Sequence, residues 1–252
     1  MSAGETTIRT FEFVGGWMCL DFANTIGGLR GGFAREYLSG YGDLVAWSQQ
    51  AGSITADTAT HLLLEAERHP GEAAAVLESA RTLREAIYGI FATLAAGTQP
   101  VEADLNVLNA ELGTALAGGR IIPIAEGFGW QWPGDQHALD QICRPIARSA
   151  ANLLTSPERS LVRECASAAC SWLFVVNTKN HRRRWCTMTG CGNAAKVRRY
   201  RQRQHGNEEA RPSYRAKTPC TADHAASAVF STSTVPCAAS AISSAISSSA
   251  SG

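Results

Sequence analysis

The sequence of 252 residues has no apolar run near the roughly 20 residues needed to cross a bilayer, which argues against a membrane protein. The first ten residues, MSAGETTIRT, lack the apolar core of a secretory signal. We therefore expect a cytoplasmic protein whose thiols stay reduced.

The 6 histidines are scattered, and no Ser/His/Asp or Cys/His spacing stands out, so we expect no enzyme activity. The segment GGLRGG lacks the lysine of a phosphate-binding P-loop.

The chain also has little overall charge, with a formal net charge of +1 at pH 7. This balance hides a strong segregation. Residues 1–157 contain 9 Lys/Arg and 17 Asp/Glu, whereas residues 158–203 contain 11 and 2. Such segregation suggests a polyanionic partner for the basic part. The alternative is that the acidic part neutralises the basic part within the molecule.

Four of the 8 cysteines form two close pairs with equal internal spacing: Cys165 and Cys170, then Cys186 and Cys191. Two short pairs joined by a hairpin-length spacer are typical of a tetrahedral zinc site. The alternatives are buried thiols or disulfides. The missing signal sequence argues against disulfides, and the charged surroundings argue against a core. Four thiolates leave no open coordination position, so we expect one structural zinc ion per chain.

A basic cluster surrounds the second cysteine pair and continues into the helix-compatible segment AAKVRRYRQR. Cys191 would lie at the start of this helix, where backbone N–H groups favour a thiolate. We expect phosphate contacts with DNA, or alternatively RNA, because phosphate contacts dominate the affinity of such proteins. The candidate nucleic-acid-binding residues are Lys179, Arg182, Arg183, Arg184, Lys196, Arg198, Arg199, Arg201 and Arg203.

Residues 1–157 read as a multihelical domain, because apolar residues recur at steps of three and four in several segments. The longest is GEAAAVLESARTLREAIYGIFATLAAG. FEFVGG, residues 11–16, predicts a short strand, and RIIPI with GFGWQW predicts a β-hairpin. The predicted fold class is mainly α with short β-hairpin elements, plus a small C-terminal four-cysteine zinc finger made of a hairpin followed by a helix. We expect a helical domain at 1–157, the finger at 158–204 and a disordered Ser/Ala-rich tail at 205–252.

Two aromatic-rich stretches beside glycines motivate a second hypothesis, a pocket for a small-molecule effector in the N-terminal domain. Its lining would be Trp17, Asp21, Asn24, Trp130 and Trp132. The alternative is that the tryptophans belong to the core and that the polar pair caps local structure.

The motifs FVGGWMCLDFANT, GFGWQW, IARSAANLLTSPE and RRRWCTMTGCGN together resemble a bacterial family, the ABATE-domain proteins with a C-terminal CGNR zinc finger. The similarity covers essentially residues 11–203. It implies a helical N-terminal domain, a zinc finger and a role as a stress-linked transcription regulator. One departure is Ala194, which stands where the CGNR signature has arginine. Loss of that arginine would weaken DNA binding if the family uses it as a DNA contact.

The sequence thus predicts a zinc-finger transcription regulator that binds DNA through its basic C-terminal module, with the N-terminal domain as a regulatory or ligand-sensing part. The alternatives are a zinc-stabilised protein–protein adaptor, in which the basic finger docks on an acidic partner, and a small-molecule sensor without direct DNA binding. High salt would weaken docking by an adaptor as well as DNA binding.

Overall fold

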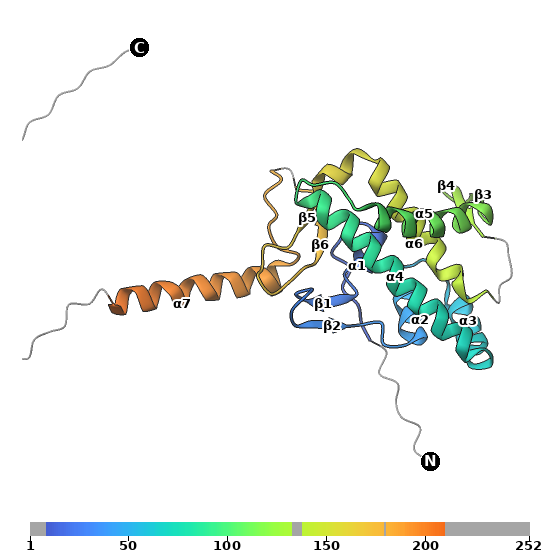
Figure 1. The fold of residues 1–252 in the computed structure, drawn as a ribbon, viewed down its shortest axis with the longest axis horizontal. Helices are drawn as coiled ribbons and strands as arrows, with labels where there is room; N and C mark the ends of the chain where they lie inside the picture. The colour runs from blue at the N-terminus through green and yellow to red at the C-terminus, as the bar shows by residue number, and fades with distance from the viewer. Residues whose placement is uncertain (1–8, 133–137, 179, 210–252) are drawn as a thin grey trace, which may run out of the picture. The chain divides into compact units, whose positions relative to one another are not determined.

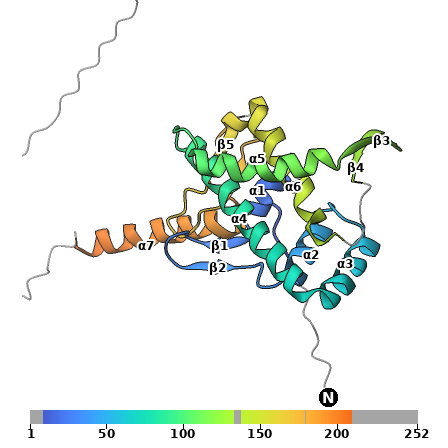
Figure 2. The same ribbon diagram turned by 45° about the vertical axis from the view of Figure 1, so that its right-hand side comes forward.

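The computed structural model describes residues 9–132, 138–178 and 180–209, and it is mainly helical, as the sequence predicts (Figures 1 and 2). None of the helices within these residues is long and apolar enough to cross a membrane. The helices are α1 (Met18–Ala23), α2 (Tyr41–Gln50), α3 (Ala56–Arg68), α4 (Pro70–Ala95), α5 (Glu102–Ala117), α6 (Cys143–Thr155) and α7 (Asn193–Glu209), with short helices η1 (Leu139–Ile142), η2 (Pro157–Leu161) and η3 (Met188–Gly192).

Helix α4 is the central helix of the body and packs against α1, α2, α3 and α5 (Figure 1). Leu83, Ile87 and Phe91 of its apolar stripe are fully buried. The helix begins at Pro70, a residue whose missing N–H and fixed φ suit a first helical turn. The preceding helix α3 begins after Thr55, whose hydroxyl accepts the N–H of Thr58 at 3.2 Å. The apolar periodicity therefore predicted the long helix α4 correctly.

A β-hairpin that was not predicted from the sequence includes the glycine-rich segment GGLRGG. Strands β1 (Ile26–Gly28) and β2 (Ala34–Glu36) pair antiparallel. Gly28 has φ +83°, and a Cβ there would lie 2.2 Å from the carbonyl oxygen of Phe33, so only glycine fits. The predicted strand at residues 11–16 is wrong, because no described strand pairs with this segment.

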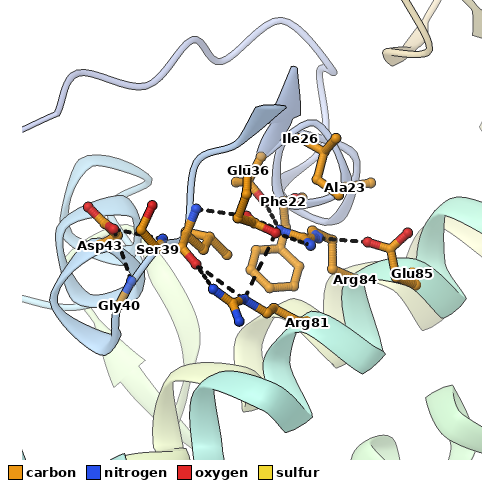
Figure 3. A network of polar contacts seen from close by, with 12 residues as sticks. Phe22, Ala23, Ile26, Glu36, Ser39, Gly40, Asp43, Arg81, Arg84 and Glu85 are labelled. Atoms are coloured by element: carbon orange, nitrogen blue, oxygen red, sulfur yellow. Dashed lines mark hydrogen bonds and ion pairs between the residues drawn. The ribbon is translucent and has the colours of Figure 1, made fainter. Parts of the chain in front are cut away.

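Ion pairs attach the hairpin to α4 (Figure 3). Arg84 donates two hydrogen bonds to the carboxylate of Glu36, at 2.6 and 2.7 Å. The side chain of Arg84 is 3 % exposed, and a bidentate pair of this kind is strong only while both partners are present. Arg30 lies in the loop between the two strands and pairs with Glu85, the residue that follows Arg84 in α4.

The second predicted hairpin is confirmed as β3 (Arg120–Ile124) and β4 (Gly127–Gln131). Trp130 and Trp132 stack with ring centroids 6.2 Å apart. Arg148 of α6 lies over the ring of Trp130 at 4.9 Å.

Two strands of the C-terminal part, β5 (Val162–Glu164) and β6 (Leu173–Val175), pair antiparallel and pack on the helical body. The side chain of Asn24 donates to the carbonyl of Leu173 at 2.9 Å and accepts its N–H at 2.8 Å. Val162, Leu173 and Val175 belong to the same core as the helices. The division expected at residue 157 stays a prediction, and across it the described residues share one core. Residues 210–252, most of the predicted tail, lie outside the described residues, and α7 continues to Glu209.

Candidate metal centre and nucleic-acid interface

The four cysteines predicted as ligands come together in the structure. Their sulfur atoms all lie within 4.8 Å of one another. The Sγ atom of Cys186 is 3.8 Å from that of Cys170 and 3.6 Å from that of Cys191. Cys165, Cys170 and Cys186 are buried, and Cys191 is partly exposed.

These sulfur–sulfur distances fit a metal site. A tetrahedron with metal–sulfur bonds of about 2.3 Å has edges of about 3.8 Å. A disulfide would require about 2.05 Å, and all four thiols are free. The donor set, four soft sulfurs with no oxygen ligand among them, favours zinc over hard cations such as Mg²⁺ or Ca²⁺.

Backbone hydrogen bonds position the first three sulfurs. The N–H of Cys165, directly after β5, donates to the carbonyl of Trp172 at 2.8 Å. Ala166 donates to the carbonyl of Arg184 at 2.8 Å, which brings the second cysteine pair beside the first. The N–H of Cys186 then points at the sulfur of Cys165, at 3.5 Å. Such N–H···S contacts stabilise a thiolate ligand.

Cys191 lies in η3, the single wide helical turn that leads directly into α7. Thr187 caps this turn, since its hydroxyl accepts the N–H of Gly190 at 3.1 Å. A Cβ at Gly192 would lie 2.9 Å from the sulfur of Met188, so this exposed side chain packs closely over the glycine of the CGN motif. The sulfur cluster therefore anchors the N-terminus of α7.

The thiols share protons when no cation is present. Hydrogen bonding from Cys170 lowers the pKa of Cys165, while hydrogen bonding to Cys165 raises the pKa of Cys170 to about 12. The same contact with Cys165 raises the pKa of Cys186. These hydrogen bonds thus favour protons on Cys170 and Cys186. A bound divalent cation would displace them, because its charge deprotonates coordinating thiols outright.

Arg183 differs from the other candidate nucleic-acid-binding residues. Its guanidinium donates to the carbonyls of Val14 at 2.9 Å, Trp185 at 3.2 Å and Cys186 at 2.5 Å. It also lies 4.2 Å from the ring centroid of Phe174. This arginine connects the cysteine loop to the N-terminal segment, so most of its donors are occupied within the protein.

The cations of α7 have the opposite surroundings. Residues 193–204 are exposed except for Ala195, which is half-buried. None of the five cations forms an ion pair with a side chain that the structure describes. They are Lys196, Arg198, Arg199, Arg201 and Arg203.

The remaining candidates lie before the second cysteine pair. Arg182 and Arg184 are exposed, and Lys179 lies outside the described residues. The exposed pair lines a hollow of about 510 Å³ together with Arg163 of β5 and His181. Sequence reasoning missed Arg163, although it belongs to the same basic segment.

The five residues predicted to line an effector pocket are not brought together. Asp21 and Asn24 line one pocket, but Trp130 and Trp132 are on the β3–β4 hairpin. Trp17 is the residue before α1 and does not line that pocket. The aromatic residues that do line it are Phe11, Tyr37, Trp47 and Trp172. Of these four residues, Trp172 could have been considered as a site residue from the sequence, because it lies two positions after the predicted metal ligand Cys170.

Comparison with known proteins agrees with this geometry. Residues 16–157 match the ABATE family model, described as "Putative stress-induced transcription regulator". Residues 162–204 match the CGNR zinc finger. Both are regulator or zinc-finger types rather than enzyme families. No curated protein matches the chain. Since the first match covers more than half of its residues, the chain belongs to the ABATE family and carries a CGNR zinc finger after the ABATE region.

Proposed function

We propose that this protein is a cytoplasmic transcription regulator that binds DNA through α7 and the loop before it. One structural zinc ion per chain, held by the four cysteines, fixes the start of the helix. The family description of residues 16–157 supports the regulatory role, and the finger match supports the metal.

The observation that carries the proposal is a helix, α7, whose described side chains beyond Ala195 are exposed and whose contacts are chiefly with η3, the turn that precedes it. A helix that is polar on all sides is not stabilised by burial. Its cations are therefore available for a partner, and a polyanion is the partner that their charge favours.

The same feature explains why nucleic acid would stabilise α7. Arg199 and Arg203 are four residues apart, and Arg198 and Arg201 are three residues apart, so like charges are neighbours on the surface of the helix. Isolated helices of this length are marginal in water. Phosphates would neutralise the repulsion, and the helix would gain order on binding.

The departure at Ala194 fits a weaker member of the family. Ala194 is exposed in the first turn of α7. An arginine at this position would project from the surface beside the other cations rather than pack inside the finger. Its loss therefore removes one cation from the proposed interface without affecting the metal cluster.

The experiment is to measure metal content and binding of the full chain to double-stranded DNA, with and without a chelator, over a salt series. We expect one zinc per chain and DNA binding that weakens steeply with salt and disappears on chelation. One zinc without DNA binding at low salt would overturn the DNA proposal. Tighter binding to single-stranded RNA, or to an acidic protein, would then favour the RNA and adaptor alternatives respectively.

A further inference from the structure

A pocket of about 450 Å³ lies where the N-terminal segment, the β1–β2 hairpin and the finger meet. Its size is within the usual range for small-molecule sites. Two hydrogen bonds between α2 and the N-terminal segment hold one wall: Phe11 donates to the side chain of Gln50 at 3.0 Å, and Gln50 donates to the carbonyl of Arg9 at 2.8 Å. Trp172, two residues after the zinc-site Cys170, forms part of another wall.

The pocket contains a buried donor with no partner. Trp47 lines the pocket and is 0 % exposed, yet its indole Nε1–H has no hydrogen-bond partner among the described residues. Leaving such a donor unpaired costs about 1–3 kcal/mol. By contrast, Asn24 is satisfied by Leu173, and Asp21 accepts the N–H of Gly15 at 2.7 Å. Asn24 and Asp21 are therefore engaged within the protein, whereas the Trp47 donor is unpaired among the described residues and closed to solvent.

Two cations stand at the rim over the same aromatic ring. The guanidinium of Arg9 lies 5.2 Å and that of Arg35 5.9 Å from the ring centroid of Tyr37. Neither forms an ion pair with a side chain that the structure describes. Guanidinium groups at the rim attract an anion, and their planar forks match a carboxylate. Glu12 at the rim is exposed and opposes this attraction.

We propose that this pocket binds a small planar aromatic carboxylate. The carboxylate would pair with Arg9 and Arg35, and the ring would lie among Tyr37, Trp47 and Trp172. A ring against these aromatic walls would add stacking to the apolar contact.

The position of Trp172 suggests what the ligand would do. Its indole N–H donates to the carbonyl of Ile26 in β1 at 2.8 Å, and its carbonyl accepts the N–H of Cys165 at 2.8 Å. A ligand against Trp172 therefore contacts the residue that joins the hairpin to the metal cluster. We infer that the acid changes DNA affinity, a step that rests on the proposed function. Linkage requires that DNA then changes the affinity for the acid by the same factor.

Binding can be tested without DNA. We would titrate the zinc-loaded full chain with naphthoate, and with its neutral isostere naphthamide, by calorimetry and tryptophan fluorescence. We expect saturable binding of the acid and at least tenfold weaker binding of the amide. Arg35→Gln, an exposed and unpaired position, should weaken acid binding at least fivefold. Glu12→Gln removes the opposing rim charge and should strengthen it.

Three outcomes would overturn the pocket proposal. The first is that naphthoate shows no saturable binding up to about 1 mM. The second is that the acid and the amide bind equally. The third is that the Arg35→Gln variant binds naphthoate like the parent protein and has an unchanged melting temperature. Unchanged DNA affinity at saturating naphthoate would overturn the regulatory step alone. Acid binding in a protein that never binds DNA would count against the proposed function and support the pocket.

Discussion

The arginines of the helical body and the cations of α7 carry the same charge in opposite surroundings. In the body, Arg84 pairs with Glu36, Arg30 with Glu85, and Arg144 with Asp140. In α7, none of the five cations has an acidic partner among the described side chains. Counting charged residues along the sequence shows only that acidic and basic residues are segregated. The ion pairs in the structure show which of the basic residues have an acidic partner. The paired body arginines stabilise the fold, and the α7 cations remain available for a ligand.

The largest effect is expected from removing a metal ligand, because the finger should depend on the metal and the helical body should not. Cys186→Ser removes a buried ligand from the sulfur cluster, and structural zinc sites contribute about 10–16 kcal/mol to the folding of small fingers. We expect loss of bound metal and of DNA binding, while the helical body keeps its far-ultraviolet circular dichroism.

The matched control is Cys143→Ala, since Cys143 is buried in α6 and is not part of the cluster. It should lower the melting temperature and leave the metal content unchanged. Equal metal loss in both variants would show that the finger has no separate dependence on the cluster.

The next effect concerns the buried body arginine. Arg84→Met should lower the free energy of unfolding by about 3 kcal/mol, because it leaves Glu36 without the bidentate partner that fixes the hairpin. Urea titrations would measure the loss. Arg201→Met in α7 should change it by less than about 0.5 kcal/mol, as expected at an exposed and unpaired position. Similar losses of unfolding free energy in Arg84→Met and Arg201→Met would contradict the difference between the body and α7.

The carboxylate of Asp21 gives a pH-dependent effect on the free energy of unfolding that is similar to the effect of Arg84→Met or smaller. Burial raises the pKa of Asp21 to about 6, against the opposing effect of backbone N–H groups and Arg183. The folded protein therefore binds this proton more tightly than the unfolded chain. Its stabilising contribution is complete below pH 4 and is lost as the pH rises through 6, a change of up to about 3 kcal/mol.

Asp21→Asn should remove that slope, because the amide oxygen can still accept the N–H of Gly15. The measurement is the difference in unfolding free energy between the parent and the variant at pH 4, 5, 6 and 7. A difference that is constant over this range would mean that Asp21 has an ordinary pKa.

The smallest effect is a gain. Ala194→Arg restores the family residue at an exposed position of α7 and should strengthen DNA binding several-fold, with one more counterion released. Fluorescence anisotropy over a salt series would measure both. Ala110→Arg, at an exposed position of α5 in the body, makes the same change of charge and should have no such effect. If both variants strengthened binding equally, overall charge rather than α7 would govern affinity.

Much of this architecture can be predicted from the sequence, because the signals are local. The cysteine spacing identified the sulfur cluster, and periodic apolar residues identified α4. The β1–β2 hairpin could not be predicted, since its strands are three residues each and Glu36 is held by an arginine of α4. Arg182, Arg183 and Arg184 are indistinguishable in the sequence. Only tertiary packing assigns the middle one to the carbonyl of Val14 and leaves its neighbours exposed.

The most direct measurement compares matched charge removals in the two regions. The salt dependence of DNA affinity would be measured for Arg198→Gln/Arg201→Gln in α7 and for Arg68→Gln/Arg120→Gln in the body. Each phosphate contact contributes about 0.9 to the log–log slope, so the α7 pair should reduce its magnitude by about 1.8. The body pair should leave it unchanged, because Arg68 is held by Glu65 and Arg120 by Gln131. An unchanged slope for the α7 pair, or an equal change for the body pair, would contradict the assignment of α7 as the nucleic-acid-binding element.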